Sequence, residues 1–315
     1  MKAITRSSAV LAGLLASMLH VAPAWALKLW VAGNGNDGNP CTAAQPCASF
    51  LVAIARLPIG GEIGVLSPGD FGAAEIPYQI SITNDGAGEA TTPSLFITAG
   101  AGDVISLRGL VVDGQYAQAI GVEVSMASAV HIQNCVIRNV QQGSNNAHGI
   151  FLRSPFRTQI FVSDTLIYNN GSNQFSTGII IPETLSGISL VLDRVHLENN
   201  VIGLEVERGG DGPAAQVVVR DSVVSGNASH GIYTRSTGSL PSFVVVEHSA
   251  VLNNGGTGIL ADGQHAIALL NGNSIKRNGA GINAINGGQL ISYGNNRNNN
   301  NIGAEGAPTG LYGRM

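Results

Sequence analysis

Short runs of β-branched residues, bounded by polar turn residues, recur every 22 to 29 residues through the C-terminal two-thirds of the chain. Each copy has such a run ending in Asp, Asn or His, then an apolar pair, Asn, and Gly followed by an aliphatic residue. β-Branched runs predict short strands, and the Asn and Gly between them predict tight turns. A period in this range is typical of stacked units that are each too small to bury their own apolar face. The sequence therefore predicts a solenoid.

Three strands are expected in each repeat, because turn residues divide it into three apolar runs. The first strands are predicted at 129–132, 159–162, 188–192, 216–219 and 243–246. The second hold an Asp-x-x-Val element, and the third begin at the marker glycines Gly121, Gly149, Gly178, Gly203, Gly231, Gly258, Gly281 and Gly303. This arrangement predicts an all-β parallel β-helix of about 9–10 coils, since the rhythms of hexapeptide helices, propellers and leucine-rich repeats are absent.

The N-terminal residues do not follow the repeat. Residues 1–26 combine two basic residues, an apolar stretch and an Ala-Trp-Ala end, which predict a secretory signal peptide cleaved after Ala26. The mature protein is therefore expected to be secreted or periplasmic. The apolar stretch of the leader and all later ones are shorter than the roughly 18 residues that a membrane span needs, so no transmembrane segment is expected.

Residues 27–66 predict an N-terminal cap on the open end of the solenoid. Ser49 is a suitable N-cap for a short amphipathic helix that ends at Arg56. Such a helix covers the unpaired backbone groups and the apolar core that a solenoid end exposes. The β-helix itself is expected at 67–303, followed by a C-terminal tail at 304–315.

The three cysteines have different expected states. Cys41 and Cys47 are separated by five residues within the predicted cap. In an oxidising compartment this spacing favours a local disulfide. A metal site is the alternative, although neither a His nor a further Cys lies nearby. Cys135 falls on an apolar position of the repeat, where a free thiol packs as a small hydrophobic group.

Charge is sparse and predominantly acidic. Charged residues make up 11% of the chain, well below the roughly 25% of an ordinary globular protein. Without Lys2 and Arg6 of the leader, 14 basic residues face 20 acidic ones, which gives a net charge of −6. This charge disfavours nucleic acid and anionic membrane surfaces as partners.

Two polar columns are expected where the coils turn. The recurring Asn residues predict a left-handed backbone and a ladder of hydrogen bonds between coils; they are Asn139, Asn170, Asn200, Asn227, Asn254 and Asn278. The recurring Asp residues, Asp164, Asp193 and Asp221, are expected to be turn residues in a second column. The alternative for these is a calcium site, because carboxylates stacked about 4.8 Å apart supply the oxygen ligands of Ca²⁺. No other cofactor is expected.

Motifs at both ends of the chain resemble those of a known family. They are VAGNGND at 31–37, NPCT at 39–42, GGEI at 60–63 and GQLISYGNN at 288–296. Across residues 29–310, the sequence resembles exported bacterial right-handed parallel β-helix proteins of the pectin-lyase-like type. The resemblance implies a right-handed coil. It implies little about activity, because this branch is described mainly by its repeats.

The catalytic motifs of enzymes of this type are not intact. Pectate-lyase-like enzymes carry Arg-x-Pro-x-x-Arg, but Arg153 and Arg157 are one residue too close. Polygalacturonase-like enzymes need paired Asp residues and Gly-His-Gly, whereas His148 and His230 are expected three coils apart. The pectin-esterase-like and mannuronan-epimerase-like motifs are also missing. The sequence therefore favours a protein that is not an enzyme.

One external face is expected to gather much of this sparse charge. The residues two and four positions after each marker glycine point outward from the third strands. Five of them form a candidate ligand-binding face, on which the aromatic ring stacks on a sugar: Tyr233, Arg235, Glu205, Glu207 and Asp262. If the chain is an enzyme, the candidate catalytic residues are Arg235, Glu205, Glu207 and Arg153.

The leading hypothesis is an exported, non-catalytic β-helix that binds a polysaccharide or another component of the cell envelope, or serves as a structural scaffold. The alternative is a calcium-assisted polysaccharide lyase, or a related carbohydrate-active enzyme, on uronic-acid polymers. The simplest interpretation of the same residues is an ordinary solvated face with weak ion pairs between coils.

Overall fold

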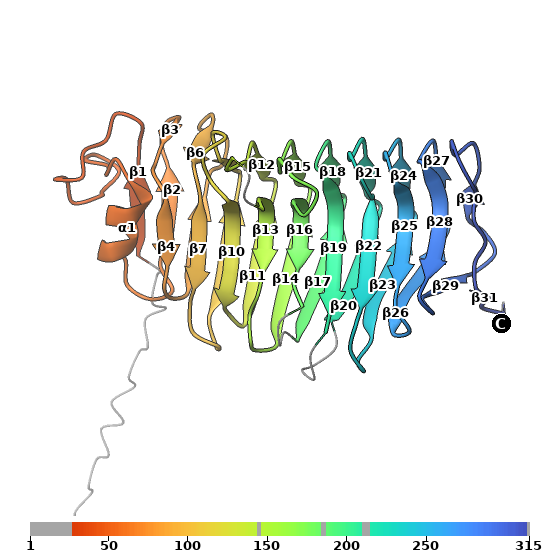
Figure 1. The fold of residues 1–315 in the computed structure, drawn as a ribbon. Helices are drawn as coiled ribbons and strands as arrows, with labels where there is room; N and C mark the ends of the chain where they lie inside the picture. The colour runs from red at the N-terminus through yellow and green to blue at the C-terminus, as the bar shows by residue number, and fades with distance from the viewer. Residues whose placement is uncertain (1–26, 144–145, 184–186, 210–214, 314–315) are drawn as a thin grey trace, which may run out of the picture.

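The computed structural model describes residues 27–143, 146–183, 187–209 and 215–313. The chain winds through three parallel β-sheets whose strands stack into an elongated column, with a helix at the N-terminal end (Figure 1). This is the predicted parallel β-helix. The predicted signal peptide lies outside the described residues.

Within the described residues the first sheet has 12 strands, and each strand pairs in parallel with the strands beside it. In spatial order they are β1 (Lys28–Val31), β2 (Glu62–Val65), β5 (Ile80–Thr83), β8 (Val104–Arg108), β11 (Ala129–Gln133), β14 (Thr158–Ser163), β17 (Ile188–Asp193), β20 (Ala215–Arg220), β23 (Ser242–Glu247), β26 (Ala266–Asn271), β29 (Gln289–Ser292) and β31 (Gly310–Leu311). The five first strands that the sequence predicts all lie in this sheet.

The second and third sheets complete each coil. The second consists of β3 (Gly69–Asp70), β6 (Ala90–Thr92), β9 (Leu110–Asp113), β12 (Val136–Arg138), β15 (Leu166–Tyr168), β18 (His196–Glu198), β21 (Val223–Ser225), β24 (Ala250–Leu252), β27 (Ser274–Lys276) and β30 (Arg297–Asn298). The third consists of β4 (Ala74–Ile76), β7 (Leu95–Thr98), β10 (Ile120–Met126), β13 (His148–Leu152), β16 (Thr177–Ile181), β19 (Ile202–Arg208), β22 (Ile232–Ser236), β25 (Thr257–Asp262) and β28 (Ala280–Ile285).

Nine consecutive coils of the described chain, from β2 to β28, contain one strand of each sheet. The last marker glycine departs from the prediction, because Gly303 opens no strand. Its N–H instead donates to the carbonyl oxygen of Gly279 at 2.7 Å. After β29 in the first sheet and β30 in the second, the described chain therefore forms no further strand of the third sheet and returns to the first sheet at β31, which pairs with β29.

The other marker glycines are required by close packing between coils. At Gly203, an added Cβ would lie 2.6 Å from the carbonyl oxygen of Gly231 in the next coil and 3.0 Å from the side-chain amide of Asn227. The same contact recurs at Gly149, Gly178, Gly231 and Gly258. Only glycine allows the backbone to approach its neighbour so closely at this turn.

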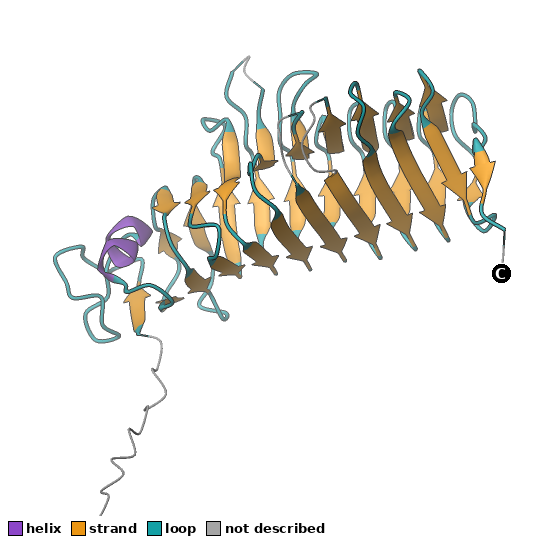
Figure 2. Cartoon of the chain, turned by 90° about the horizontal axis from the view of Figure 1, so that it is seen from below, coloured by secondary structure: helices purple, strands orange, loops and turns teal. Residues whose placement is uncertain are grey.

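A short helix covers the N-terminal end of the column, as predicted (Figure 2). Helix α1 (Phe50–Arg56) begins after Ser49, whose side chain accepts a hydrogen bond from the N–H of Val52. Phe50 is fully buried and packs on Phe71, with ring centroids 4.9 Å apart. The helix therefore closes the hydrophobic core. The boundaries of the predicted cap and tail remain predictions.

The cysteines have the expected states. Cys41 and Cys47 form a disulfide in the loop before α1. Cys135 is a free, buried thiol. Burial raises the pKa of Cys135 to about 11, so this thiol stays protonated at neutral pH.

The predicted asparagine ladder runs between the second and third sheets. Asn227 Nδ2 donates to Asn254 Oδ1 at 2.8 Å, and Asn254 Nδ2 donates to Asn278 Oδ1 at 2.8 Å. The same oxygens accept the backbone N–H of the preceding coil, as in Asn227 N–H to Asn254 Oδ1 at 3.1 Å. The ladder residues are buried, and they are Asn170, Asn200, Asn227, Asn254 and Asn278. Side-chain amides thus satisfy polar backbone groups inside the turn.

Two parts of that prediction are wrong. Asn139 does not belong to the ladder, because Val140 takes that position and donates its N–H to Asn170 Oδ1. The left-handed backbone also does not occur at the ladder residues. It occurs one residue earlier, as at Asn139, Asn169 and Asn199, with φ of 56°, 57° and 53°. The turn therefore divides the two properties of Asn, its amide hydrogen bonds and its tolerance of positive φ, between adjacent residues.

Candidate functional site

The outward residues of the third sheet lie in register from coil to coil. One column runs through Glu123, Phe151, Ile180, Glu205, Tyr233, Leu260 and Asn283. A second column, two residues later along each strand, includes Glu207, Arg235 and Asp262. Ser125, Arg153 and Pro182 follow the first-column residues Glu123, Phe151 and Ile180 by two positions. We call the two columns and these three residues the outer face. The alternation after the marker glycines correctly predicted the columns from Phe151 onward, but it did not assign Glu123 and Ser125 to them.

Five predicted residues come together on β19, β22 and β25. Glu205 is paired in register with Tyr233, and Glu207 is paired with Arg235. A guanidinium nitrogen of Arg235 lies 3.5 Å from a carboxylate oxygen of Glu207. The hydroxyl of Tyr233 donates to Asp262 Oδ2 at 2.9 Å. The tyrosine ring is therefore fixed between charged groups of three successive coils.

Burial shifts the titration of this cluster. Glu205 is 7% exposed, and its burial, together with the nearby charge of Glu207, raises the pKa of Glu205 to about 8. Burial also raises the pKa of Glu207, which Arg235 opposes. Burial, and then the hydrogen bond to Asp262, raise the pKa of the Tyr233 hydroxyl. At neutral pH the cluster thus holds a protonated carboxyl at Glu205, which can donate a hydrogen bond, and a protonated phenol at Tyr233, whose O–H is donated to Asp262.

Arg153 lies apart from this cluster, contrary to its inclusion among the candidate catalytic residues. It follows β13, three coils before the strand of Arg235, which is roughly 14 Å along the axis. Its guanidinium pairs with Glu123 at 2.6 Å and lies over the ring of Phe151, 5.7 Å from the centroid. Arg153 therefore does not act on the same reacting atom as Glu205 and Arg235.

Three residues that sequence reasoning did not assign to the face also contribute to it. His148 and His230 contact the aromatic residues of the outer face, His148 with Phe151 at 5.3 Å and His230 with Tyr233 at 5.5 Å between ring centroids. Glu123 is the third. A signal was present for all three: Glu123 follows a marker glycine by two residues, and each His begins a His-Gly-Ile-aromatic-x-Arg hexapeptide.

Comparison with known proteins decides the family. The family described as right handed beta helix region matches residues 96–302, more than half of the chain. The chain belongs to this right-handed β-helix family. The predicted handedness is thereby confirmed. The solved structure of a rhamnogalacturonan lyase is similar with a TM-score of 0.43 and 12% identity, over 84% of this chain and 75% of that chain. No curated protein sequence matches the chain.

The three aspartates proposed as calcium ligands do not form one column in this β-helix. Asp193 is paired in register with Ser163 and Arg220, whereas Asp164 and Asp221 occupy the left-handed position one residue later. In the intervening coil that position belongs to Arg194. The prediction of a single aspartate column is wrong because the repeat shifts by one residue in the coil of Asp193.

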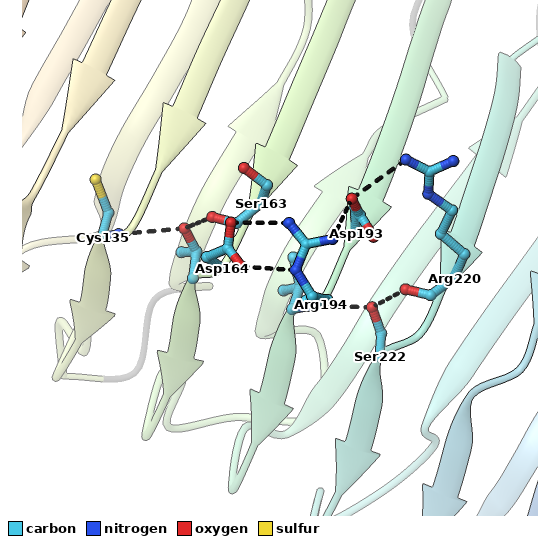
Figure 3. Close-up of polar contacts among 9 residues, drawn as sticks. Cys135, Ser163, Asp164, Asp193, Arg194, Arg220 and Ser222 are labelled. Carbon is cyan, nitrogen blue, oxygen red and sulfur yellow. Dashed lines mark hydrogen bonds and ion pairs between the residues drawn. The ribbon is translucent and has the colours of Figure 1, made fainter.

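Arginine side chains bind the carboxylates of Asp164 and Asp193 instead (Figure 3). The guanidinium of Arg194 contacts both oxygens of Asp164, at 2.7 and 3.0 Å, and Asp193 Oδ2 at 2.8 Å. Arg220 also contacts Asp193, at 3.2 Å. Within the described residues, no group of three or more His, Cys, Asp or Glu is arranged to hold a metal ion. Likewise, no described helix has the length and apolarity needed to cross a membrane.

Proposed function

We propose that this β-helix is an exported, non-catalytic protein that binds a polysaccharide of the cell envelope on its outer face. The observation that carries the proposal is the fixed ring of Tyr233 among Glu205, Glu207, Arg235 and Asp262. Sugar-binding sites combine an aromatic platform for the apolar face of a sugar with polar groups for its hydroxyls. The sheet holds both in place, so little side-chain entropy is lost on binding.

The protonation states favour binding over a lyase reaction. A lyase needs a base that removes a proton from the sugar acid. The raised pKa of Tyr233 and its hydrogen bond to Asp262 make it a poor base at neutral pH. Arg235 already pairs with Glu207. Glu205, one of the candidate catalytic residues, is protonated at neutral pH and is therefore better suited to donate a hydrogen bond than to remove a proton.

Glu205 supports a second candidate, a carbohydrate-active enzyme that uses acid catalysis. Its pKa of about 8 keeps it protonated at neutral pH, with Glu207 nearby on the same strand. Two carboxyl groups with different protonation states are the usual acid and base of glycoside cleavage. This candidate predicts turnover of a bound glycan that is lost in Glu205→Gln, whereas the binding proposal predicts no product.

A glycan array probed with the purified protein tests the proposal. Tyr233→Ala should weaken binding to the recognised glycan about tenfold or more, because the ring supplies stacking worth about 1.4 kcal/mol. Phe161→Ala is a matched control, since Phe161 is a partly exposed aromatic residue stacked on His131, but on the first sheet. Binding that is equal in Tyr233→Ala and the wild-type protein, or the absence of any bound glycan, contradicts the proposal.

A further inference from the structure

The outer face repeats with a period of three coils. Glu123, Phe151 and Ile180 are neighbours in the first column, in the order carboxylate, aromatic ring, aliphatic side chain. The next three members of the column repeat this order, and they are Glu205, Tyr233 and Leu260. The burial repeats as well, because both glutamates and both aliphatic residues are buried while both rings are partly exposed.

The flanking residues repeat in the same way. The segments 148–153 and 230–235 are HGIFLR and HGIYTR, which share His, Gly, Ile and Arg. Each histidine contacts the ring of its own segment, as described above. Each is also held from the next coil, His148 Nδ1 at 2.9 Å from Thr177 Oγ1, and His230 Nδ1 accepting the N–H of Thr257 at 3.0 Å.

These histidines position the rings without adding charge. Burial lowers the pKa of His148 to about 4 and lowers the pKa of His230 as well. Both imidazoles are therefore neutral at neutral pH and serve as apolar supports for the aromatic rings. Each segment thus supplies one oriented ring, with an arginine two residues later on the same side of the strand.

The two rings lie on a line parallel to the axis of the β-helix. Their strands, β13 and β22, are three coils apart, which is roughly 14 Å. The residues between them, Ile180 and Glu205, belong to the same column. A linear polymer that lies along the axis can therefore contact both rings, while a short ligand reaches only one.

The charges of the face indicate a neutral polymer. Arg153 pairs with Glu123 at 2.6 Å, and Arg235 pairs with Glu207 at 3.5 Å. Neither arginine is thus available to neutralise an acidic sugar without breaking its own ion pair. Asp262 adds a further carboxylate close to Tyr233. A polyuronate would meet this acidic surface with like charge, whereas the hydroxyl groups of a neutral sugar carry no charge that opposes it.

We infer that the outer face contains two copies of one sugar subsite, centred on Phe151 and Tyr233, which together bind a neutral linear glycan lying along the axis of the β-helix. This inference rests on the proposed function and specifies its ligand. Because the second contact is intramolecular once the first is made, a chain that spans both subsites gains affinity by roughly 10² or more over either contact alone.

Equilibrium dialysis with labelled disaccharides and octasaccharides counts and compares the subsites. The probes are cello-, xylo- and manno-oligosaccharides, with oligogalacturonates as the acidic series. For a neutral series we expect two disaccharide sites in the wild-type protein, one in Phe151→Ala or Tyr233→Ala, and none in the double variant. The octasaccharide should bind once, and each single substitution should weaken it by roughly 10² because the second contact is lost.

The outcomes separate this inference from the proposed function. Binding that is lost in Tyr233→Ala but unchanged in Phe151→Ala leaves a single site and overturns the duplication. Preference for oligogalacturonates overturns the neutral ligand while leaving carbohydrate binding intact. Absence of binding to either series overturns both proposals. Phe161→Ala is again the matched control, and Phe151→Tyr, which keeps the ring, should retain both sites if loss in Phe151→Ala reflects the subsite rather than misfolding.

Discussion

Replacing Asn254 by alanine tests whether the asparagine ladder holds the coils together. Asn254 is 1% exposed. Its Nδ2 donates to Asn278 Oδ1 at 2.8 Å and to the carbonyl oxygen of Val224 at 3.2 Å. Its Oδ1 accepts from the N–H of Asn227 at 3.1 Å and from Asn227 Nδ2 at 2.8 Å. The substitution therefore removes four hydrogen bonds from the interior at once.

The expected cost follows from the groups left behind. Asn227 Nδ2 keeps a bond to Leu197, and Asn278 Oδ1 still accepts the N–H of residue 254. The N–H of Asn227 and the carbonyl of Val224 lose their side-chain partner. A buried polar group without its partner costs about 1–3 kcal/mol, so the free energy of unfolding should fall by about 2–6 kcal/mol. Urea unfolding followed by circular dichroism measures this change.

The preceding residue supplies a matched control. Asn253 has the left-handed backbone, with φ of 56°. Asn253→Ala should cost about 1 kcal/mol, since alanine lacks the tolerance of Asn for this conformation. Asn283→Ala, at an exposed strand position, should change stability by less than about 0.5 kcal/mol. The reasoning is refuted if Asn254→Ala is no more destabilising than Asn253→Ala.

Three further predictions concern protonation, thiol access and calcium. In the folded protein the pKa of Glu205 is about 8, above its ordinary value of 4.5. Between these two pH values the folded state binds more protons than the unfolded state. The free energy of unfolding therefore falls as pH rises, by at most about 1.4 kcal/mol per pH unit. Glu205→Gln should lack this fall when urea unfolding is compared near pH 5 and near pH 8; parallel curves for the two proteins would show that Glu205 is not protonated by burial. Cys135 should react with iodoacetamide only after unfolding, because its thiol is buried with a pKa of about 11; mass spectrometry detects the adduct, and fast modification of the native protein would disprove the burial. Millimolar calcium should leave the thermal midpoint unchanged, because Arg194 and Arg220 bind the carboxylates of Asp164 and Asp193; a clear rise in scanning calorimetry would contradict this geometry.

Local patterns in the sequence were sufficient to predict the strands, the helix and their order along the chain. β-Branched runs predicted the strands, Ser49 predicted the start of α1, and the short Cys41–Cys47 spacing predicted the disulfide. Each of these depends on residues that are close in sequence, so the chain reveals them without knowledge of its neighbours in space. The outward positions after each marker glycine belong to the same class, because strand alternation is local.

The sequence by itself determined the solenoid, its three strands per coil and the residue types of the outer face. Only the tertiary structure decided which of two adjacent residues, such as Asn253 and Asn254, enters the ladder. It also decided that Asp193 is shifted by one residue from the position of Asp164. The repetition of Glu-aromatic-aliphatic triplets every three coils likewise appears only in the structure. The physical reason is that the register between coils is set by packing of the inner side chains and by hydrogen bonds between residues 24 to 30 positions apart. Turns of unequal length separate these residues, so no fixed spacing in the sequence records which of them become neighbours.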